Sequence, residues 1–214
     1  MMKRKLLVCC LTFLTIPLSA TEVGDTLVKQ SKKGFSVLKL NGGFSFLTSK
    51  VEVGDESYSF QPGLDYMLEC ELREKSENGV GKGWGLVLKG NKTYIGGANK
   101  FDLYHFGINR IWWDSFGKNN RWRWEAAVGG GVCLYNDKTN RDRHIETFQN
   151  PYIGIGVLLK AGCEYRITNH FGLGLEMNNF LHFFFDDAMK AQREKTLLTG
   201  FVTSGLSLGL RFYL

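Results

Sequence analysis

The stretch GIGVLLKAGCEYRI, residues 154–167, alternates two kinds of side chain along its whole length. Charged residues and glycines occupy most positions on one face, whereas apolar side chains occupy every position on the other. The apolar face consists of Ile155, Val157, Leu159, Ala161, Cys163, Tyr165 and Ile167. This period of two predicts a β-strand with one apolar face. The stretch is also longer than the roughly 5 to 6 residues that are usual in soluble sheets.

The same alternation returns in seven further stretches of the chain. A short turn, TNH at 168–170, leads into FGLGLEMN, which repeats the two faces over residues 171–178. The chain ends in SLGLRFYL, which alternates up to Leu214. The remaining stretches lie at 37–47, 63–73, 83–91, 104–113 and 121–135. Together they predict eight long strands.

The connections between these strands alternate in character. Long polar connections are expected after the first, third, fifth and seventh strands, at about 48–58, 93–100, 136–150 and 186–198. The connections after the fourth and sixth strands are shorter, and EKSENGVGK after the second is an exception in length. An even number of strands with long loops at one end predicts an all-β fold, an eight-stranded antiparallel up-and-down transmembrane β-barrel over residues 34–214.

The first twenty residues, MMKRKLLVCCLTFLTIPLSA, have the pattern of a secretory signal peptide. Lys3, Arg4 and Lys5 precede an apolar stretch that ends at the small residues Ser19 and Ala20. This stretch is shorter than the ~20 residues that a membrane-spanning helix needs, so cleavage is expected. Residues 1–20 are therefore predicted to be removed, and 21–33 to form a short periplasmic segment.

The non-apolar face of the strands decides between a soluble and a membrane barrel. A soluble barrel of the lipocalin kind turns its apolar face inward and its charges to water. Here the charges of both signs are interspersed with glycine, which is typical of a crowded interior in which each charge needs a partner. The predicted lumen charge network consists of Lys39, Asp65, Glu69, Glu71, Arg73, Lys89, Arg121, Arg123, Glu125, Lys160, Glu164, Arg166, Glu176 and Arg211.

The apolar face would then contact lipid. Lipid offers no hydrogen-bond partners, so only a closed barrel pairs every backbone group of a spanning sheet. Together with the signal peptide, this predicts the outer membrane of a Gram-negative-type cell. Aromatic girdles mark the bilayer interfaces of such barrels, and the candidates are Tyr66, Trp84, Trp112, Trp122, Trp124 and Tyr165.

The closing SLGLRFYL resembles the β-signal of outer-membrane barrels, in which a polar residue, a glycine and two hydrophobic residues are spaced over the last strand. The matching positions are Ser207, Gly209, Phe212 and Leu214, although the family more often ends in Phe. The run KAGCEYRITNHFGLGLEM also resembles the sixth-to-seventh strand hairpin of the small outer-membrane β-barrel family of the Bacteroidota type. That family is similar in architecture to the membrane domain of outer membrane protein A. The resemblance implies recognition of the free C-terminus by the barrel assembly machinery.

An eight-stranded barrel is just wide enough for its own side chains to fill the lumen. We therefore expect a structural or surface-interaction protein, acting through its loops as a monomer in contact with outer-membrane lipid and lipopolysaccharide. No cofactor is expected. Nucleic acid is not expected as a partner, since the net charge falls from +6 to +3 once the signal peptide is removed. Basic loop residues could contact lipopolysaccharide phosphates: Lys138, Arg141, Arg143, His144, Lys190, Arg193 and Lys195.

Two other functions stay open from the sequence. An outer-membrane enzyme acting on lipid A would need a base such as His182, with Asp186 or Asp187 nearby and Thr203 or Ser204 on the returning strand. A narrow channel for small solutes would need a lumen without charges of mixed sign. Metal and disulfide sites are not indicated, because neither the histidines nor the mature cysteines have suitable spacing: His105, His144, His170, His182, Cys70, Cys133 and Cys163.

Overall fold

The structure is a computed structural model that describes residues 34–49, 51–53, 56–75, 80–95, 99–117, 119–137, 152–184 and 200–214. The predicted signal peptide at 1–20 and the segment at 21–33 lie outside these residues and stay predictions. Most of the predicted loops at 136–150 and 186–198 lie outside them too, including the basic residues proposed to contact lipopolysaccharide.

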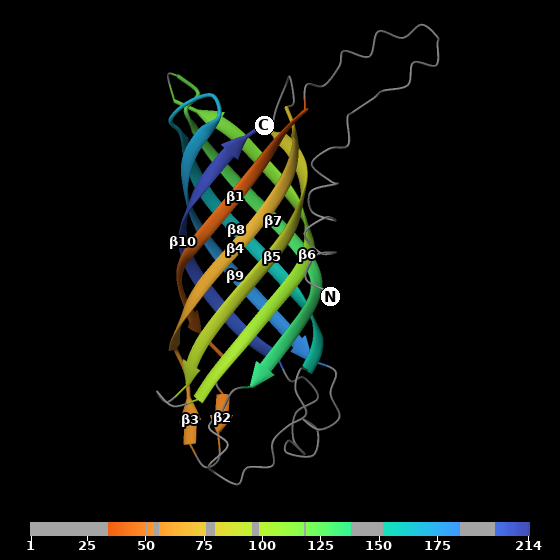
Figure 1. Cartoon of the computed structure of the whole chain (residues 1–214), viewed down its shortest axis with the longest axis vertical. Helices are drawn as coiled ribbons and strands as arrows, with labels where there is room; N and C mark the ends of the chain where they lie inside the picture. The colour runs from red at the N-terminus through yellow and green to blue at the C-terminus, as the bar shows by residue number, and fades with distance from the viewer. Residues whose placement is uncertain are drawn as a thin grey trace, which may run out of the picture. The chain divides into compact units, whose positions relative to one another are not determined.

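Eight long antiparallel strands close into a barrel, as the sequence predicts (Figure 1). Each strand pairs with its neighbours along the chain, and the first pairs with the last, so the up-and-down order is confirmed. No helix of the described residues is long and apolar enough to cross a membrane. The barrel strands are β1 (Gly34–Leu47), β4 (Gln61–Glu74), β5 (Gly81–Ile95), β6 (Asn99–Phe116), β7 (Trp122–Asp137), β8 (Tyr152–Arg166), β9 (Phe171–Phe184) and β10 (Gly200–Tyr213).

The two ends of the barrel differ. One, here called the terminal end, holds Gly34 and Leu214 together with the connections 75–80, 117–121 and 167–170. The other, here called the loop end, holds the strand ends that precede and follow residues 48–60, 96–98, 138–151 and 185–199. At the terminal end the first and last strands are joined beyond their ladder, because the Ser36 and Leu214 backbones donate to each other over 3.2 and 2.9 Å.

Two connections at the loop end differ from the prediction. The first contains a small antiparallel hairpin, β2 (Val51–Val53) with β3 (Glu56–Tyr58), which the sequence pattern did not indicate. The predicted loop at 93–100 is wrong, because β5 and β6 extend until only 96–98 connect them. Polar residues suggested a loop there, but Thr93 faces the lumen, where its hydroxyl donates to Asn91 Oδ1 over 2.6 Å.

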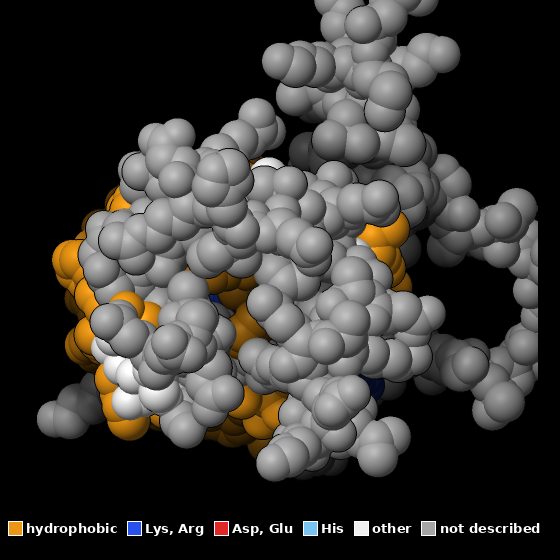
Figure 2. All heavy atoms as spheres, turned by 90° about the horizontal axis from the view of Figure 1, so that it is seen from below, with side chains coloured by type: hydrophobic (Ala, Val, Ile, Leu, Met, Phe, Trp, Pro, Cys, Tyr) orange, Lys and Arg blue, Asp and Glu red, His pale blue; other side chains and the backbone are white. Residues whose placement is uncertain are grey.

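Burial alternates along every barrel strand, so the two faces have opposite character. The inward positions are buried and include most of the charged residues, whereas the outward positions expose large apolar side chains. Viewed from the loop end, hydrophobic side chains line the sides of the barrel (Figure 2). Leu208 and Phe44, for example, are both 68% exposed. Such a continuous exposed apolar surface is far larger than monomeric soluble proteins tolerate.

Two adjacent glycines of β1 show how tightly the interior is packed. A Cβ added to the inward Gly43 would lie 2.1 Å from the Leu206 carbonyl oxygen and 2.6 Å from the Ser207 Cα, both in the backbone of β10. A Cβ added to the outward Gly42 would meet nothing within 4 Å. Gly43, and not Gly42, is therefore required for the strands to approach each other at the β1–β10 closure.

These two glycines provide a matched test of the barrel closure. We expect Gly43→Ala to lower the free energy of unfolding by about 1–3 kcal/mol, because backbone atoms cannot yield as a side chain does. We expect Gly42→Ala to leave it unchanged or slightly higher, since alanine suits a strand better than glycine. Urea unfolding of refolded protein in detergent measures both. Equal effects of the two substitutions would contradict the described register of β1 and β10.

Candidate functional site

Lys39 lies at the centre of a cluster of charged side chains in the terminal half of the lumen. Its ammonium is 2.5 Å from Glu125 Oε1 and 2.7 Å from Glu71 Oε1. Lys160, from the opposite side of the barrel, contacts Glu69 and lies 3.3 Å from the same Glu125 oxygen. All five side chains are at most 1% exposed. Each carboxylate is thus shared between lysines that come from different strands.

Arg73 connects three of the glutamates. Its Nε donates to Glu71 over 2.7 Å, its Nη1 donates to Glu164 over 2.7 Å, and its Nη2 donates to Glu125. These carboxylates come from β4, β7 and β8, so one guanidinium fixes three strands across the lumen. Charge-assisted hydrogen bonds of this kind are about twice as strong as neutral ones.

Arg211 closes the cluster on the side of the last strand. Its Nη2 donates to Glu176 Oε1 over 2.5 Å, and its Nη1 donates to Asn41 Oδ1 over 2.6 Å. Gly174 makes room for it, because a Cβ at that position would lie 2.4 Å from Arg211 Nη2. The glycines of the polar face thus leave space for long charged side chains in a narrow barrel.

A second, smaller charged group lies nearer the loop end. The Lys89 ammonium donates to Asp65 and, over 2.8 Å, to Asn178 Oδ1. The Asn178 amide in turn donates to the other Asp65 oxygen over 2.9 Å. The three side chains therefore form a closed triangle in which both charges are buried and hydrogen-bonded.

Aromatic rings cover the network at the terminal end. The Arg123 guanidinium carbon lies 5.3 Å from the Phe35 and Trp113 ring centroids and 4.9 Å from that of Tyr213. The guanidinium is also 3.7 Å from Glu164. We did not single out Phe35 or Trp113 from the sequence. The alternation through His105 would have placed Trp113 inside, since eight residues separate the two.

The structure brings twelve of the fourteen predicted residues into the lumen network, six of each sign. The prediction was wrong for two. Arg121 precedes β7 in the turn and is exposed, and Arg166 is the last residue of β8, where its guanidinium donates to the exposed Asn169 over 3.4 Å. Both lie at the rim: Arg121 is outside the strand, where alternation does not apply, and Arg166 is at the strand end, where its side chain reaches the turn.

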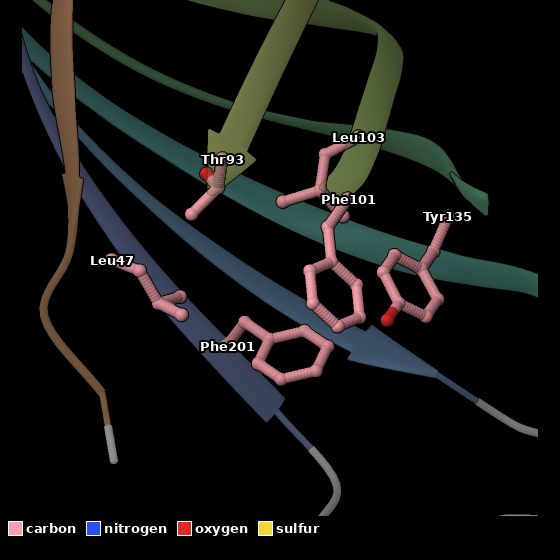
Figure 3. Close-up of a pocket in the computed structure, with 6 residues that line it drawn as sticks. All are labelled: Leu47, Thr93, Phe101, Leu103, Tyr135 and Phe201. Atoms are coloured by element: carbon pink, nitrogen blue, oxygen red, sulfur yellow. The ribbon is translucent and has the colours of Figure 1, made fainter. Parts of the chain in front are cut away.

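The loop half of the lumen is apolar, which the prediction of a charge-filled lumen missed. Phe101, Tyr135 and Phe201 point toward one another inside the barrel (Figure 3), and the first two rings stack with centroids 5.3 Å apart. With Leu47, Thr93 and Leu103 they surround a cavity of about 10 Å³. That is room for at most one water molecule. The loop half is therefore filled by its own side chains, as the terminal half is.

Two buried histidines lie between the charged and the apolar halves. Both contact the Phe180 ring, with centroids 4.5 Å from His105 and 4.0 Å from His182. His182 Nε2 is 3.4 Å from Thr203 Oγ1, whereas Ser204 faces the outer wall and donates to Asn179 over 2.7 Å. Ser204 is thus on the wrong face to be activated by His182.

Little else in the described residues supports catalytic or metal chemistry. Asp186, Asp187 and His144 lie outside them, and His170 is in the exposed turn after β8. Among the residues that the structure describes, no group of three or more histidine, cysteine or acidic side chains could hold a metal ion. Cys133 and Cys163 are free thiols, and Cys70 is half-buried on β4.

Comparison with known proteins identifies the fold but no family. No protein-family model matches the sequence, and no curated protein is similar to it in sequence. Among solved structures, neisserial surface protein A is similar with a TM-score of 0.51 and 15% identity, over 84% of this chain and 98% of that one. Ail, the attachment invasion locus protein of Yersinia pestis, is similar with a TM-score of 0.47 and 10% identity, over 85% of this chain and 99% of that one. The outer membrane protein OprG from Pseudomonas aeruginosa is similar with a TM-score of 0.44 and 9% identity, over 84% of this chain and 96% of that one.

The Lys89–Asp65 pair allows the network to be tested by substitution. Lys89→Met leaves Asp65 charged and buried without its cation, so we expect it to lower the free energy of unfolding by about 3–5 kcal/mol. Adding Asp65→Leu should restore much of that loss, because the second substitution removes the unpaired charge. Lys82→Met, at an exposed position of the same strand, should change the free energy of unfolding by less than about 0.5 kcal/mol.

Urea unfolding followed by tryptophan fluorescence measures the three variants side by side. An effect of Lys89→Met no larger than that of Lys82→Met would show that the buried pair contributes nothing. A double variant less stable than the single one would contradict the unpaired-charge explanation.

Proposed function

We propose that this protein is an outer-membrane β-barrel with a closed lumen, and that its role is a structural or surface-interaction role at the loop end. One observation carries the proposal: the barrel buries its charges in the lumen and exposes its apolar side chains on the outer wall. In water the apolar side chains of the outer wall would be solvated and the charges would be buried. In a bilayer the apolar side chains contact lipid, and the charges pair with one another inside the barrel.

The exposed aromatic residues support the membrane placement by their spacing. On β5 both Trp84 and Tyr94 face outward, the first near the terminal end and the second near the loop end. Ten residues at about 3.3 Å each, tilted by about 40°, give a height of ~25 Å, the height of the apolar band of such barrels. Trp122 and Trp124 add to the girdle of the terminal end.

The filled lumen supports a role outside it. Its terminal half holds a balanced network of ion pairs, and its loop half leaves a cavity of only about 10 Å³. In the part of the barrel that the structure describes, this leaves little room for a solute and argues against a channel. The finer parts of the proposal are the Bacteroidota type, a monomeric state and contact of the loops with lipopolysaccharide, and they rest on the sequence pattern.

Planar-bilayer recording tests the closed lumen. We expect refolded protein to insert into vesicles, to show the mobility shift on heating that is typical of folded barrels, and to give no large, stable conductance steps. Stable openings from inserted protein would refute the closed lumen, and failure to insert would refute the membrane placement.

The C-terminal strand permits a second test, of assembly. We propose that Ser207, Gly209, Phe212 and Leu214 form the signal for the barrel assembly machinery. Leu214→Asp should block assembly in cells, because it replaces the final hydrophobic residue, whereas Leu214→Phe should preserve it. Refolding of both variants in detergent, where no machinery is present, should be similar, because the Leu214 side chain is 65% exposed and outside the lumen. Normal assembly of Leu214→Asp in cells would refute the signal.

A further inference from the structure

A row of alternating glycine and tyrosine crosses the outer wall on β1, β4, β5 and β6, which lie side by side (Figure 1). The strand register places Gly42 opposite Tyr66, Tyr66 opposite Gly90, and Gly90 opposite Tyr104. The Tyr66 ring lies over Gly90, since a Cβ there would be 2.2 Å from the ring. The glycines in this row have no side chain on the outer surface, whereas the tyrosine side chains protrude from it.

This relief produces a groove of about 360 Å³ on the outer wall. Six of its nine lining residues are at outward-facing positions, namely Leu40, Tyr66, Leu68, Leu88, Gly90 and Tyr104, and the other three, Asn41, Met67 and Lys89, are at lumen-facing positions of the same strands. The groove lies outside the lumen and is far larger than the cavity inside it. Its volume is within the range of sites that bind small ligands, about 300–1,000 Å³. Its apolar lining suits a hydrocarbon chain.

The groove has a polar end. One row nearer the loop end, Lys92 and Asp102 are opposite each other on the outer wall. Asp102 is 4% exposed and accepts a hydrogen bond from the Tyr104 hydroxyl over 3.5 Å. Lys92 is exposed and forms no ion pair within the described part of the chain. Its cation is thus available beside the end of an apolar groove.

The height of this end matches the bilayer interface of the proposed membrane placement. Tyr94, two residues beyond Lys92 on β5, belongs to the aromatic girdle of the loop end. A lysine just inside that girdle reaches the level of lipid headgroups. An acyl chain entering the groove from there would run toward Leu88 and Leu40 in the apolar band.

We propose that this groove binds an acyl chain of lipid A, with Lys92 binding a lipid A phosphate. The inference rests on the proposed function, which places the loop end in the outer leaflet. A phosphate and an acyl chain on one molecule match the cation and the apolar groove that lie next to each other. A second copy of the chain would have to place an apolar surface against Lys92 and offers no such match.

Native mass spectrometry of the refolded, detergent-solubilised protein tests the proposal with lipid A, dephosphorylated lipid A and phosphatidylethanolamine. Wild-type protein should retain lipid A at least about fivefold more strongly than the dephosphorylated form, the contribution of one basic side chain to an anionic headgroup. It should retain phosphatidylethanolamine more weakly than lipid A. Equal retention of all three lipids would overturn the proposal.

Two pairs of variants separate the headgroup from the chain. Lys92→Glu should lower retention of lipid A and leave that of the dephosphorylated form unchanged, whereas Lys82→Glu, on the same strand near the terminal end, should change neither. Leu88→Trp should fill the groove and lower retention of both forms. Leu86→Trp, on the next outward row, should lower neither.

Each variant is first checked for the heat-induced mobility shift and for insertion into vesicles. If the wild type does not insert, the proposed function fails. If it inserts but Lys92→Glu and Lys82→Glu behave alike, only the lipid site fails. A protein dimer that Leu88→Trp dissociates would show that a second copy occupies the groove and would also overturn the lipid site.

Discussion

The whole structure depends on the neutralisation of charge inside the barrel. Burying an isolated ion costs several kcal/mol, and a buried pair is tolerated only when its hydrogen bonds are nearly complete. Lys39, Arg73 and Glu125 meet this condition because each contacts partners from more than one strand. Such contacts exist only when all eight strands are in register and closed. The network therefore favours the closed state over arrangements in which one of the strands that carry its charges is displaced.

This requirement also explains which residues the sequence could identify. Within a strand, alternation determines the face, so twelve lumen charges could be predicted from position alone. Outside a strand it determines nothing, which is why Arg121 was wrongly included. Arg166 has the inward parity but is the last residue of β8, so its long side chain reaches the exposed turn instead of the lumen. Their removal turns an excess of two positive charges into equal numbers of both signs. The requirement for equal numbers of buried positive and negative charges is therefore a second sequence signal, and it indicates that two of the eight cations lie outside the lumen.

The apolar part of the lumen was harder to predict. Phe101 and Phe201 lie outside the predicted strands at 104–113 and 207–214, so alternation assigned them no face, whereas Tyr135 has the inward parity of Arg123 and Glu125. The predicted loop at 93–100 hid Phe101 in this way, since its strand was expected to begin later. Tertiary packing resolves the ambiguity: these rings fill the lumen against one another, which a linear pattern cannot express. The outward face was easier to predict, because its apolar positions run the full length of each strand.

A lumen filled in both halves moves the question of function to surfaces. Among the described residues, the cavity in the loop half of the lumen has about 10 Å³ and the groove on the outer wall about 360 Å³, so a ligand has far more room on the wall. The glycine positions follow the same division. Inward glycines such as Gly174 make room for the protein's own Arg211, so their space is already used. The outward Gly42 meets no neighbour, and the ring over Gly90 borders a groove that the protein's own side chains do not fill. Space left open on an apolar wall is filled by whatever surrounds that wall, and for a membrane barrel this is lipid.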